Sequence, residues 1–177
     1  LLMALCPLAE ARKPNFIVIF IDDMGYGDIG PFGSKKNETP HLDRMAKEGM
    51  KLTSFYLASS VCTPSRAALM TGSYPRRVGL GKGSGHVVLF PGDPHGLHPK
   101  EVTIAEMLKD AGYATGCFGK WHLGGFDEKM AQGPVHVMPP WKAGFEECFS
   151  TFNVLVAHDP YARIGKHGIE GIYWQNG

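Results

Sequence analysis

The stretch of sequence that decides the fold class is FIVIFI, residues 16–21, an unbroken run of β-branched and aromatic side chains. Such a run is typical of a strand that is buried on both faces of a parallel sheet. Two carboxylates, Asp22 and Asp23, follow it directly and lead into a glycine-rich loop. Because open α/β sheets bind ligands at the carboxyl ends of their strands, we expect a ligand site at this point.

Predicted helices and strands alternate along the rest of the chain. Thr39 and Pro40 have the chemistry of an N-cap and a first helical residue, and Gly49 can end the helix that they begin. Further helices are predicted at residues 64–70 and 102–111, further strands at residues 51–57 and 113–118, and a long loop at residues 73–100. This alternation predicts an α/β fold with a mostly parallel sheet.

Composition places the chain among ordinary globular proteins. Its 177 residues are enough for one domain with a core, and 44% of them are hydrophobic while 20% are charged. The formal net charge of +1 gives no basic excess for binding nucleic acid. We therefore expect no nucleic-acid partner.

The first eleven residues, LLMALCPLAEA, form a short apolar stretch that ends in a small-x-small pattern. This pattern is typical of a signal-peptidase site, and the stretch is too short to span a bilayer. We interpret residues 1–11 as the remnant of a signal peptide. We expect an exported protein without a membrane span, periplasmic or extracellular, or lysosomal or secretory in a eukaryote. A frayed apolar N-terminus is the alternative, and the bulky Leu5 disfavours a lipoprotein anchored at Cys6.

The number of cysteines is the next constraint. If Cys6 is removed with the signal, Cys62, Cys117 and Cys148 form an odd set that cannot all pair within the chain. No cysteine spacing fits a zinc site. Three residues separate Cys62 from Arg66, which excludes the cysteine phosphatases because their phosphate loop is longer, and no cysteine-protease signature is present. A plain buried cysteine remains the alternative to a functional one.

The stretch around Cys62 is CTPSRAALMTG, residues 62–72, and Pro64 is predicted to begin a helix just after the cysteine. A helix N-terminus favours an anion through its free N–H groups and its dipole. The stretch also resembles the signature of the formylglycine-dependent, arylsulfatase-like sulfatases of the alkaline phosphatase superfamily. Further blocks resemble motifs of that family in the same order, so that the resemblance covers residues 13–150; they are residues 14–28, 39–46, 119–124 and 144–149.

This resemblance implies a fold and an activity. The fold is α/β and alkaline-phosphatase-like, with a mixed, mostly parallel sheet flanked by helices that is incomplete in this chain. Residues 12–177 would be the N-terminal part of a truncated sulfatase catalytic domain. The implied activity is that of a sulfuric ester hydrolase acting on aryl or carbohydrate sulfates. Its implied partners are a sulfated small molecule or glycan and the maturation enzyme that makes formylglycine.

In that family the signature cysteine is oxidised to Cα-formylglycine, which implies that Cys62 is the precursor of the nucleophile. A thiolate that attacked sulfur would form a thiosulfate ester with no easy release. Hydrated formylglycine has two hydroxyls on one carbon, so one can attack sulfur and the other can expel sulfate as the aldehyde re-forms. The resemblance makes Arg66 the residue that steadies this group, Lys120 a catalytic and sulfate-binding residue, and His122 the general base.

The resemblance also implies a metal site. Asp22, Asp23 and modified Cys62 match the metal ligands of the family, and hard oxygens suit Ca²⁺, with Mg²⁺ as an alternative. A dication would stabilise charge on the sulfuryl oxygens. Apart from the family, the two aspartates equally fit a capped turn, and His122 fits a structural histidine. His158 is a further candidate for substrate binding, and a surface histidine fits that position as well.

The ligand set in this chain is small for a calcium site. Ca²⁺ takes about six to eight oxygen ligands, which is more than Asp22, Asp23 and residue 62 supply. We therefore expect the isolated chain to bind Ca²⁺ weakly and to show no turnover. Two other functions stay open: a phosphonate or phosphate ester hydrolase of the same superfamily, and a non-catalytic paralogue that binds sulfated glycans.

Overall fold

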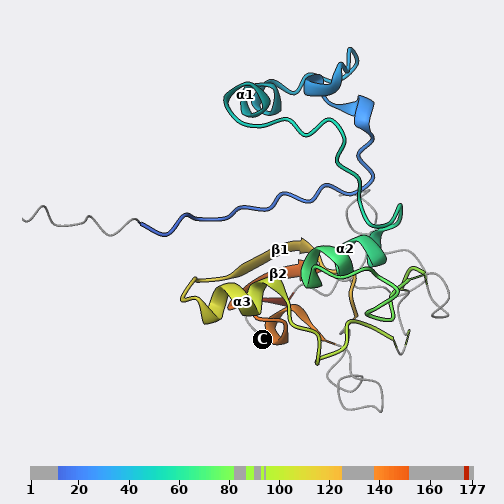
Figure 1. Cartoon of the computed structure of the whole chain (residues 1–177), viewed down its shortest axis with the longest axis vertical. Coiled ribbons are helices and arrows are strands. Elements are labelled where there is room, and N and C mark those ends of the chain that lie inside the picture. Colours follow the sequence, from blue (N-terminus) through green and yellow to red (C-terminus); the bar gives the residue numbers. More distant parts are fainter. Residues whose placement is uncertain are drawn as a thin grey trace, which may run out of the picture. The chain divides into compact units, whose positions relative to one another are not determined.

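The computed structural model describes residues 12–81, 87–89, 93, 95–124, 138–151 and 174–175 (Figure 1). They belong to two compact units, Leu1–Thr53 and Ser54–Gly177, and each unit is described by itself. The predicted signal-peptide remnant, residues 1–11, lies outside the described residues, and so does His158.

The first unit contains two short 3-10 turns and one α-helix in its described part. They are η1 (Tyr26–Asp28), η2 (Gly30–Phe32) and α1 (Pro40–Glu48). Thr39 is the N-cap of α1, Pro40 its first residue and Gly49 its C-cap, which confirms the predicted helix. The Thr39 hydroxyl accepts a hydrogen bond from the Gly30 amide (2.8 Å), so it ties α1 to η2 and caps no helical amide.

The strand predicted at residues 16–21 is wrong in this structure. Figure 1 draws this segment as an elongated trace without an arrow, and five of its six side chains are exposed, from 47% at Ile21 to 87% at Ile17. A strand needs a neighbouring strand to complete its backbone hydrogen bonds. The strands of the described residues all lie in the other unit and pair with one another. The strand predicted at residues 51–57 is also wrong, since those residues form only an exposed turn and coil.

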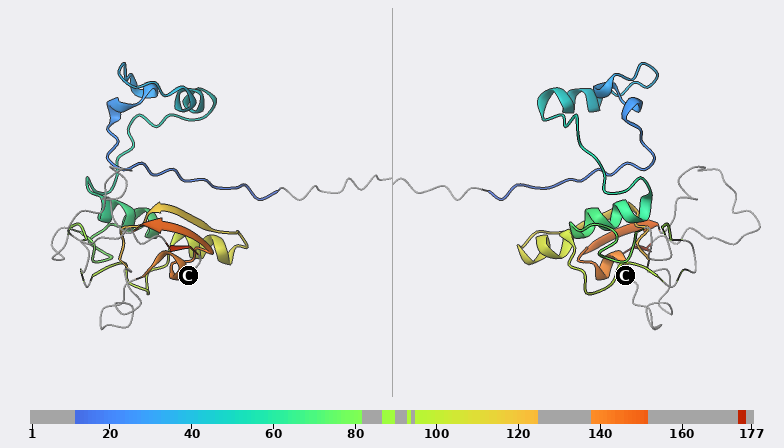
Figure 2. Two further views of the ribbon diagram at one scale, coloured as in Figure 1. Left: turned by 180° about the vertical axis from the view of Figure 1, so that it is seen from behind. Right: turned by 45° about the vertical axis from the view of Figure 1, so that its right-hand side comes forward.

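The second unit contains two α-helices, a short 3-10 turn and the described sheet (Figures 1 and 2). They are α2 (Cys62–Thr71), α3 (Ile104–Asp110), β1 (Gly116–Lys120), η3 (Pro140–Lys142), β2 (Glu147–Thr151) and β3 (Trp174–Gln175). Strand β1 is parallel to β2, and β2 is antiparallel to β3, in the order β1-β2-β3. The strand predicted at residues 113–118 is confirmed as β1, although it begins later. The mixed sheet with adjacent helices fits the predicted α/β class.

Helix α3 begins where local side-chain chemistry requires it. The hydroxyl of its N-cap, Thr103, accepts a hydrogen bond from the Glu106 amide (3.1 Å), and the Glu106 carboxylate accepts one from the Thr103 amide (2.8 Å). This reciprocal capping box satisfies two amides that a helix N-terminus leaves without partners. The chain turns away at Gly112, whose φ of 83° is the left-handed value that glycine adopts without strain. The helix predicted at residues 102–111 is confirmed with slightly shorter bounds.

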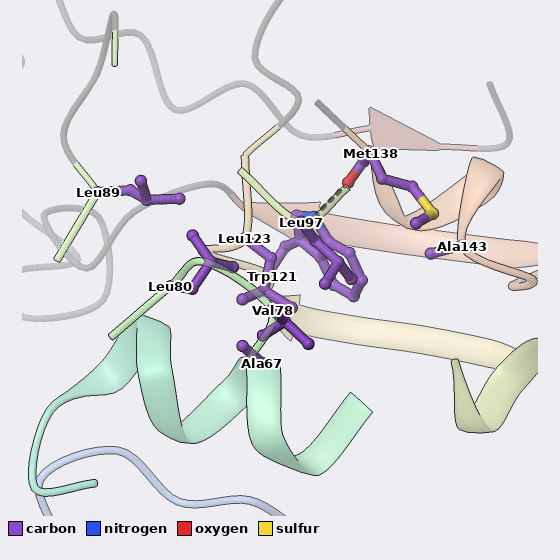
Figure 3. Packing of buried hydrophobic residues seen from close by; sticks show 9 residues of the cluster. All are labelled: Ala67, Val78, Leu80, Leu89, Leu97, Trp121, Leu123, Met138 and Ala143. Carbon is purple, nitrogen blue, oxygen red and sulfur yellow. Dashed lines mark hydrogen bonds between the residues drawn. The ribbon is translucent and has the colours of Figure 1, made fainter. Parts of the chain in front are cut away.

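A hydrophobic cluster forms the core of the described part of the second unit (Figure 3). Its buried members are Ala67, Val78, Leu80, Leu89, Leu97, Trp121, Leu123, Met138 and Ala143. Ala67 comes from α2, and Trp121 and Leu123 follow β1 directly. The indole Nε1 of Trp121 donates a hydrogen bond to the Met138 carbonyl (3.0 Å), so its polar edge is satisfied inside the core.

The long loop predicted at residues 73–100 is more than a surface connection. Its described residues contain no helix or strand, as predicted. Nevertheless, Val78, Leu80, Leu89 and Leu97 from this loop are all buried in the core cluster. The loop therefore packs against Trp121 and Leu123, the residues that follow β1, and it can position that segment.

Candidate active site

The signature stretch begins the helix α2 at Cys62 and not at Pro64, which corrects the prediction by two residues. Val61 is the N-cap, with extended backbone angles (φ −128°, ψ 159°). Pro64 fits inside the first turn because the amide that proline lacks has no helical partner there. Cys62 is therefore the first helical residue and is half-buried. Its position at a helix N-terminus still favours an anion nearby.

Strand β1 carries the second motif to the same region. Lys120 is the last residue of β1, and Trp121 and His122 follow it. Both residues are buried: Trp121, a member of the core cluster, is 3% exposed, and His122 is 1% exposed. His122 has a φ of 55°, in the left-handed region that non-glycine residues rarely occupy. A buried histidine held in such a conformation requires specific contacts, and such residues gather at functional sites.

Thr63 supplies one of these contacts. Its hydroxyl donates a hydrogen bond to the His122 carbonyl oxygen (3.0 Å) and accepts one from the Leu89 amide (3.3 Å). Thr63 is itself 1% exposed, so these bonds form out of contact with water. Thr63, the residue next to Cys62, is thus hydrogen-bonded directly to the backbone of His122.

The imidazole of His122 has a defined protonation pattern. Its Nε2 lies 2.7 Å from the Leu89 carbonyl oxygen. Because a carbonyl oxygen only accepts, Nε2 must carry the proton of this hydrogen bond. In the neutral ring the lone pair then resides on Nδ1, which is a buried atom. Nδ1 is therefore the nitrogen of His122 that can accept a further proton.

A second link joins α2 to the end of β1. Nη1 of Arg66 donates a hydrogen bond to the Lys120 carbonyl oxygen (2.6 Å), across 54 residues of sequence. A charged donor makes such a bond stronger than a neutral one. Together with the Thr63 contact, it brings Cys62, Arg66, Lys120 and His122 into one part of the second unit.

The two aspartates lie in the first unit, Asp22 half-buried and Asp23 exposed. Asp23 has a φ of 54°, and aspartate is one of the few residue types that adopt this conformation readily. The loop after them is shaped by the Gly25 amide, which donates to the Asp28 carboxylate (2.6 Å). Their carboxylate oxygens suit Ca²⁺ or Mg²⁺ chemically. Among the described residues, however, no three His, Cys, Asp or Glu side chains gather to hold a metal ion.

Comparison with known proteins decides the family. The model of the sulfatase family matches residues 14–164. This chain belongs to the sulfatase family. The match spans all the blocks on which the resemblance was based, and it confirms that resemblance.

Curated sulfatases from mammals are similar to this sulfatase chain. Mus musculus steryl-sulfatase is 54% identical over 114 residues, which are 64% of this chain and 18% of that protein. Homo sapiens arylsulfatase A is 52% identical over 125 residues, which are 70% of this chain and 24% of that protein. The chain therefore spans about a quarter or less of the length of these relatives.

Solved sulfatase structures share the fold. The crystal structure of Ps i-CgsB superposes with a TM-score of 0.69 at 38% identity, over 81% of this chain and 29% of that one. The predicted fold class, an α/β alkaline-phosphatase-like fold of which this chain contains part, is confirmed. In the described part of this chain, no helix is long and apolar enough to cross a membrane.

Sequence reasoning missed two residues that organise this part of the sulfatase. Thr63 lies inside the signature, but its partners are 26 and 59 residues away, and spacing alone gives no sign of them. Leu89 acts through its backbone amide and carbonyl, so its side-chain type carries no signal at all. Only the folded loop that buries Leu89 could reveal its role.

Proposed function

We propose that the protein to which this chain belongs hydrolyses sulfuric esters with a nucleophile made from Cys62. The observation that carries this proposal is the pair of hydrogen bonds that join α2 to the end of β1, from Thr63 to His122 and from Arg66 to Lys120. They gather a nucleophile precursor, two cationic residues and an imidazole in one unit. Covalent hydrolysis of an anionic ester can use a nucleophile, cationic groups that bind the anion, and a proton acceptor.

Residue 62 would carry the nucleophile at the start of α2. A formylglycine there would supply, as its hydrate, one hydroxyl to attack sulfur and a second to release sulfate. The amides of the first helical turn favour negative charge beside this residue. The half-buried position of Cys62 is compatible with access for both a maturation enzyme and a substrate.

His122 would act as the proton acceptor through Nδ1. The Leu89 carbonyl keeps the proton on Nε2, so the lone pair of the neutral ring stays on Nδ1. When Nδ1 takes a proton, the same carbonyl stabilises the positive ring, because a charged donor strengthens the hydrogen bond. The Thr63 hydroxyl fixes the His122 backbone in its left-handed conformation, and this orients the ring.

The two cationic residues would bind and stabilise the anionic group. Lys120, at the carboxyl end of β1, lies where α/β sheets bind their ligands, and it would bind sulfate. Arg66 is anchored by the Lys120 carbonyl and would steady the group at position 62. His158 would be a further substrate contact.

Asp22, Asp23 and the modified residue 62 would hold Ca²⁺, with Mg²⁺ as the alternative. A dication held by these residues would supply electrostatic stabilisation of negative charge on the sulfuryl oxygens. Supporting this is the donor chemistry of the two carboxylates, which are the hard oxygens these ions prefer. Chelation of the metal from the full-length protein should therefore abolish turnover.

A sulfated glycan or a small aryl sulfate would be the substrate. One structure similar to this chain was solved with the oligosaccharide k-i-k-neocarrahexaose, at a TM-score of 0.63 and 37% identity. That likeness supports a carbohydrate sulfate. The other proposed partner is the enzyme that converts Cys62 to formylglycine. We also propose that the protein is exported, and secretion of the full-length protein would test this.

Matched esters test the proposed activity. The full-length protein, produced with a formylglycine-generating enzyme, is assayed on para-nitrophenyl sulfate and para-nitrophenyl phosphate. We expect sulfate hydrolysis to dominate and Cys62→Ala to lower kcat by on the order of 10³-fold or more, because the nucleophile is lost. Cys117→Ser is the matched control, a second half-buried cysteine of the same unit that should retain activity.

The other outcomes discriminate between the remaining functions. A preference for the phosphate ester would replace the proposal with a phosphate or phosphonate ester hydrolase. Binding of sulfated glycan without any turnover, in protein that carries the modification, would indicate a non-catalytic glycan-binding paralogue.

A further inference from the structure

Two cysteines outside the proposed active site lie directly opposite each other in the sheet. Cys117 on β1 and Cys148 on β2 are register partners in the parallel ladder. Neighbouring strands lie about 4.8 Å apart. The Cα atoms of disulfide-bonded cysteines are separated by about 4.4–6.8 Å. The backbone spacing of this pair is therefore within the range that a disulfide spans.

The two thiols also share one face of the sheet. The next register pair, Phe118 and Phe149, is exposed by 75% and 50%. Because side chains alternate between faces, Cys117 and Cys148 lie on the opposite, covered face. Cys148 is 2% exposed, and Cys117 is half-buried against the hydrophobic core. Both residues are thiols in the structure.

The surroundings of the two thiols differ in a way that suits thiol–disulfide exchange. Burial raises the pKa of the Cys117 thiol, but a hydrogen bond from Ser150 (3.4 Å) and the charge of Arg66 favour its thiolate. Burial, together with smaller contributions from the nearby Cys117 and Glu147, raises the pKa of the Cys148 thiol to about 11. Cys117 is thus both the more accessible thiol and the one whose ionisation has support.

We propose that Cys117 and Cys148 form a dithiol modification site, which a small-molecule or protein disulfide oxidises to an intrachain disulfide between β1 and β2. The Cys117 thiolate attacks one sulfur of the external disulfide and releases the first thiolate. The Cys148 thiolate then attacks Sγ of Cys117, and the second external thiolate leaves. The two released thiolates take up the protons of the two cysteines, so one disulfide is reduced as the other forms.

If Cys6 is removed with a signal peptide, this pairing accounts for the odd set of three cysteines that remains. It assigns Cys117 and Cys148 to each other and leaves Cys62 as the thiol outside any pair. The disulfide would also fix β1 against β2 three residues before Lys120. The inference does not depend on sulfatase activity, since it rests on strand register, face and burial.

The test is a map of disulfides in the folded, full-length protein, produced without the maturation enzyme so that residue 62 keeps its thiol. The protein is treated with glutathione disulfide, the remaining thiols are alkylated, and tryptic peptides are analysed without reduction. Trypsin places Cys117, Cys148 and Cys62 in separate peptides, residues 110–120, 143–163 and 52–66. We expect the first two to be linked, with a mass about 2 Da below their sum, and to separate on reduction.

Controls keep the result specific. The same treatment in denaturant should give mixed pairings that include residues 52–66, because register no longer selects the partner. Cys148→Ser should stop the reaction at a mixed disulfide of glutathione with Cys117. The proposal is overturned if folded wild-type protein yields only mixed disulfides, or if Cys62 is linked to either cysteine.

Discussion

The first unit contains the apolar run at residues 16–21, and the second unit contains the signature stretch at residues 62–72. Only the second stretch contributes buried residues. In the first unit, the described helices η1, η2 and α1 contain no buried residue, and five of the six side chains of the apolar run at residues 16–21 are exposed. In the second unit, α2 buries four residues and the segment after β1 enters the core. A clear sequence pattern is therefore buried in one unit and exposed in the other. The difference depends on whether side chains that pack against it lie in the same unit.

The difference extends to the functional residues. Cys62, Arg66, Lys120 and His122 are organised by hydrogen bonds between segments more than fifty residues apart. In the loop that follows Asp23, in contrast, the Gly25 amide donates to the Asp28 carboxylate three residues away, and the Asn37 side-chain amide donates to the Asp28 carbonyl nine residues away. The residues proposed to act on the ester are thus held by long-range hydrogen bonds within the second unit, whereas these two hydrogen bonds of the loop after Asp23 span fewer than ten residues.

The largest expected effect is a loss in the free energy of unfolding when a buried side chain of the second unit is shortened, compared with an exposed one of the first unit. Leu123→Ala removes a side chain that is fully buried in the core and should lower the free energy of unfolding of this chain by about 2–5 kcal/mol. Ile17→Ala changes a side chain that is 87% exposed and should cost less than about 0.5 kcal/mol. Urea unfolding of both variants measures this. Equal losses would refute the contrast between the units.

Two glycines give a similar comparison at the level of the backbone. Gly144 has a φ of 90°, and an added Cβ would lie 2.8 Å from the Ala105 carbonyl carbon. Gly144→Ala should therefore destabilise by about 3 kcal/mol, since strain and a backbone clash combine. Gly33, with a φ of 95°, has nothing within 4 Å of an added Cβ. Gly33→Ala should cost only the strain, about 1–2 kcal/mol, and thermal unfolding would separate the two.

Removing the hydroxyl of Thr63 tests the link between the signature at residues 62–72 and the motif at residues 119–124. In the full-length enzyme, Thr63→Val keeps the shape of the side chain but removes the bonds to His122 and Leu89. We expect kcat to fall by about 10–100-fold with a smaller change in KM, because the proton acceptor is misoriented. Thr63→Ser keeps the hydroxyl and should restore most of the activity. If both variants matched the wild type, the hydroxyl would have no positioning role.

The smallest expected effect is a pH dependence in the second unit. Burial raises the pKa of the Cys148 thiol from 9.0 to about 11, so the folded state holds this proton more tightly than the unfolded state. The resulting stability is complete below pH 9 and is lost as the pH rises toward 11. For the reduced chain, we expect a loss of about 1–2 kcal/mol, and a smaller loss in Cys148→Ala, because burial also raises the pKa of the Cys117 thiol that this variant keeps. Urea unfolding at about pH 8 and about pH 10 measures the difference.

Elements with local signals could be predicted from the sequence. Helix α1 follows from Thr39 and Pro40, and the helix predicted at residues 102–111 forms as α3, where the structure adds the reciprocal cap between Thr103 and Glu106. The start of α2 was placed two residues late because Pro64 also fits within the first turn. Helix ends depend on side chains within a few positions, so these signals suffice.

Features that depend on distant partners could not be predicted in this way. The run at residues 16–21 has the composition of a buried strand, but burial requires a neighbouring strand that composition does not specify. The proton on Nε2 of His122 is set by the backbone carbonyl of Leu89, which lies in a loop without a motif. Motifs therefore identify the reactive residues, and only the fold shows how they are oriented.

The mass of the tryptic peptide that contains residue 62, residues 52–66, tests the proposed nucleophile directly. In full-length protein produced with its maturation enzyme, we predict a mass about 18 Da below that of the cysteine peptide, because formylglycine replaces the thiol. The same peptide from Thr63→Ser protein serves as a control for recognition of the signature. An unmodified thiol at residue 62 in catalytically active protein would contradict the proposed mechanism.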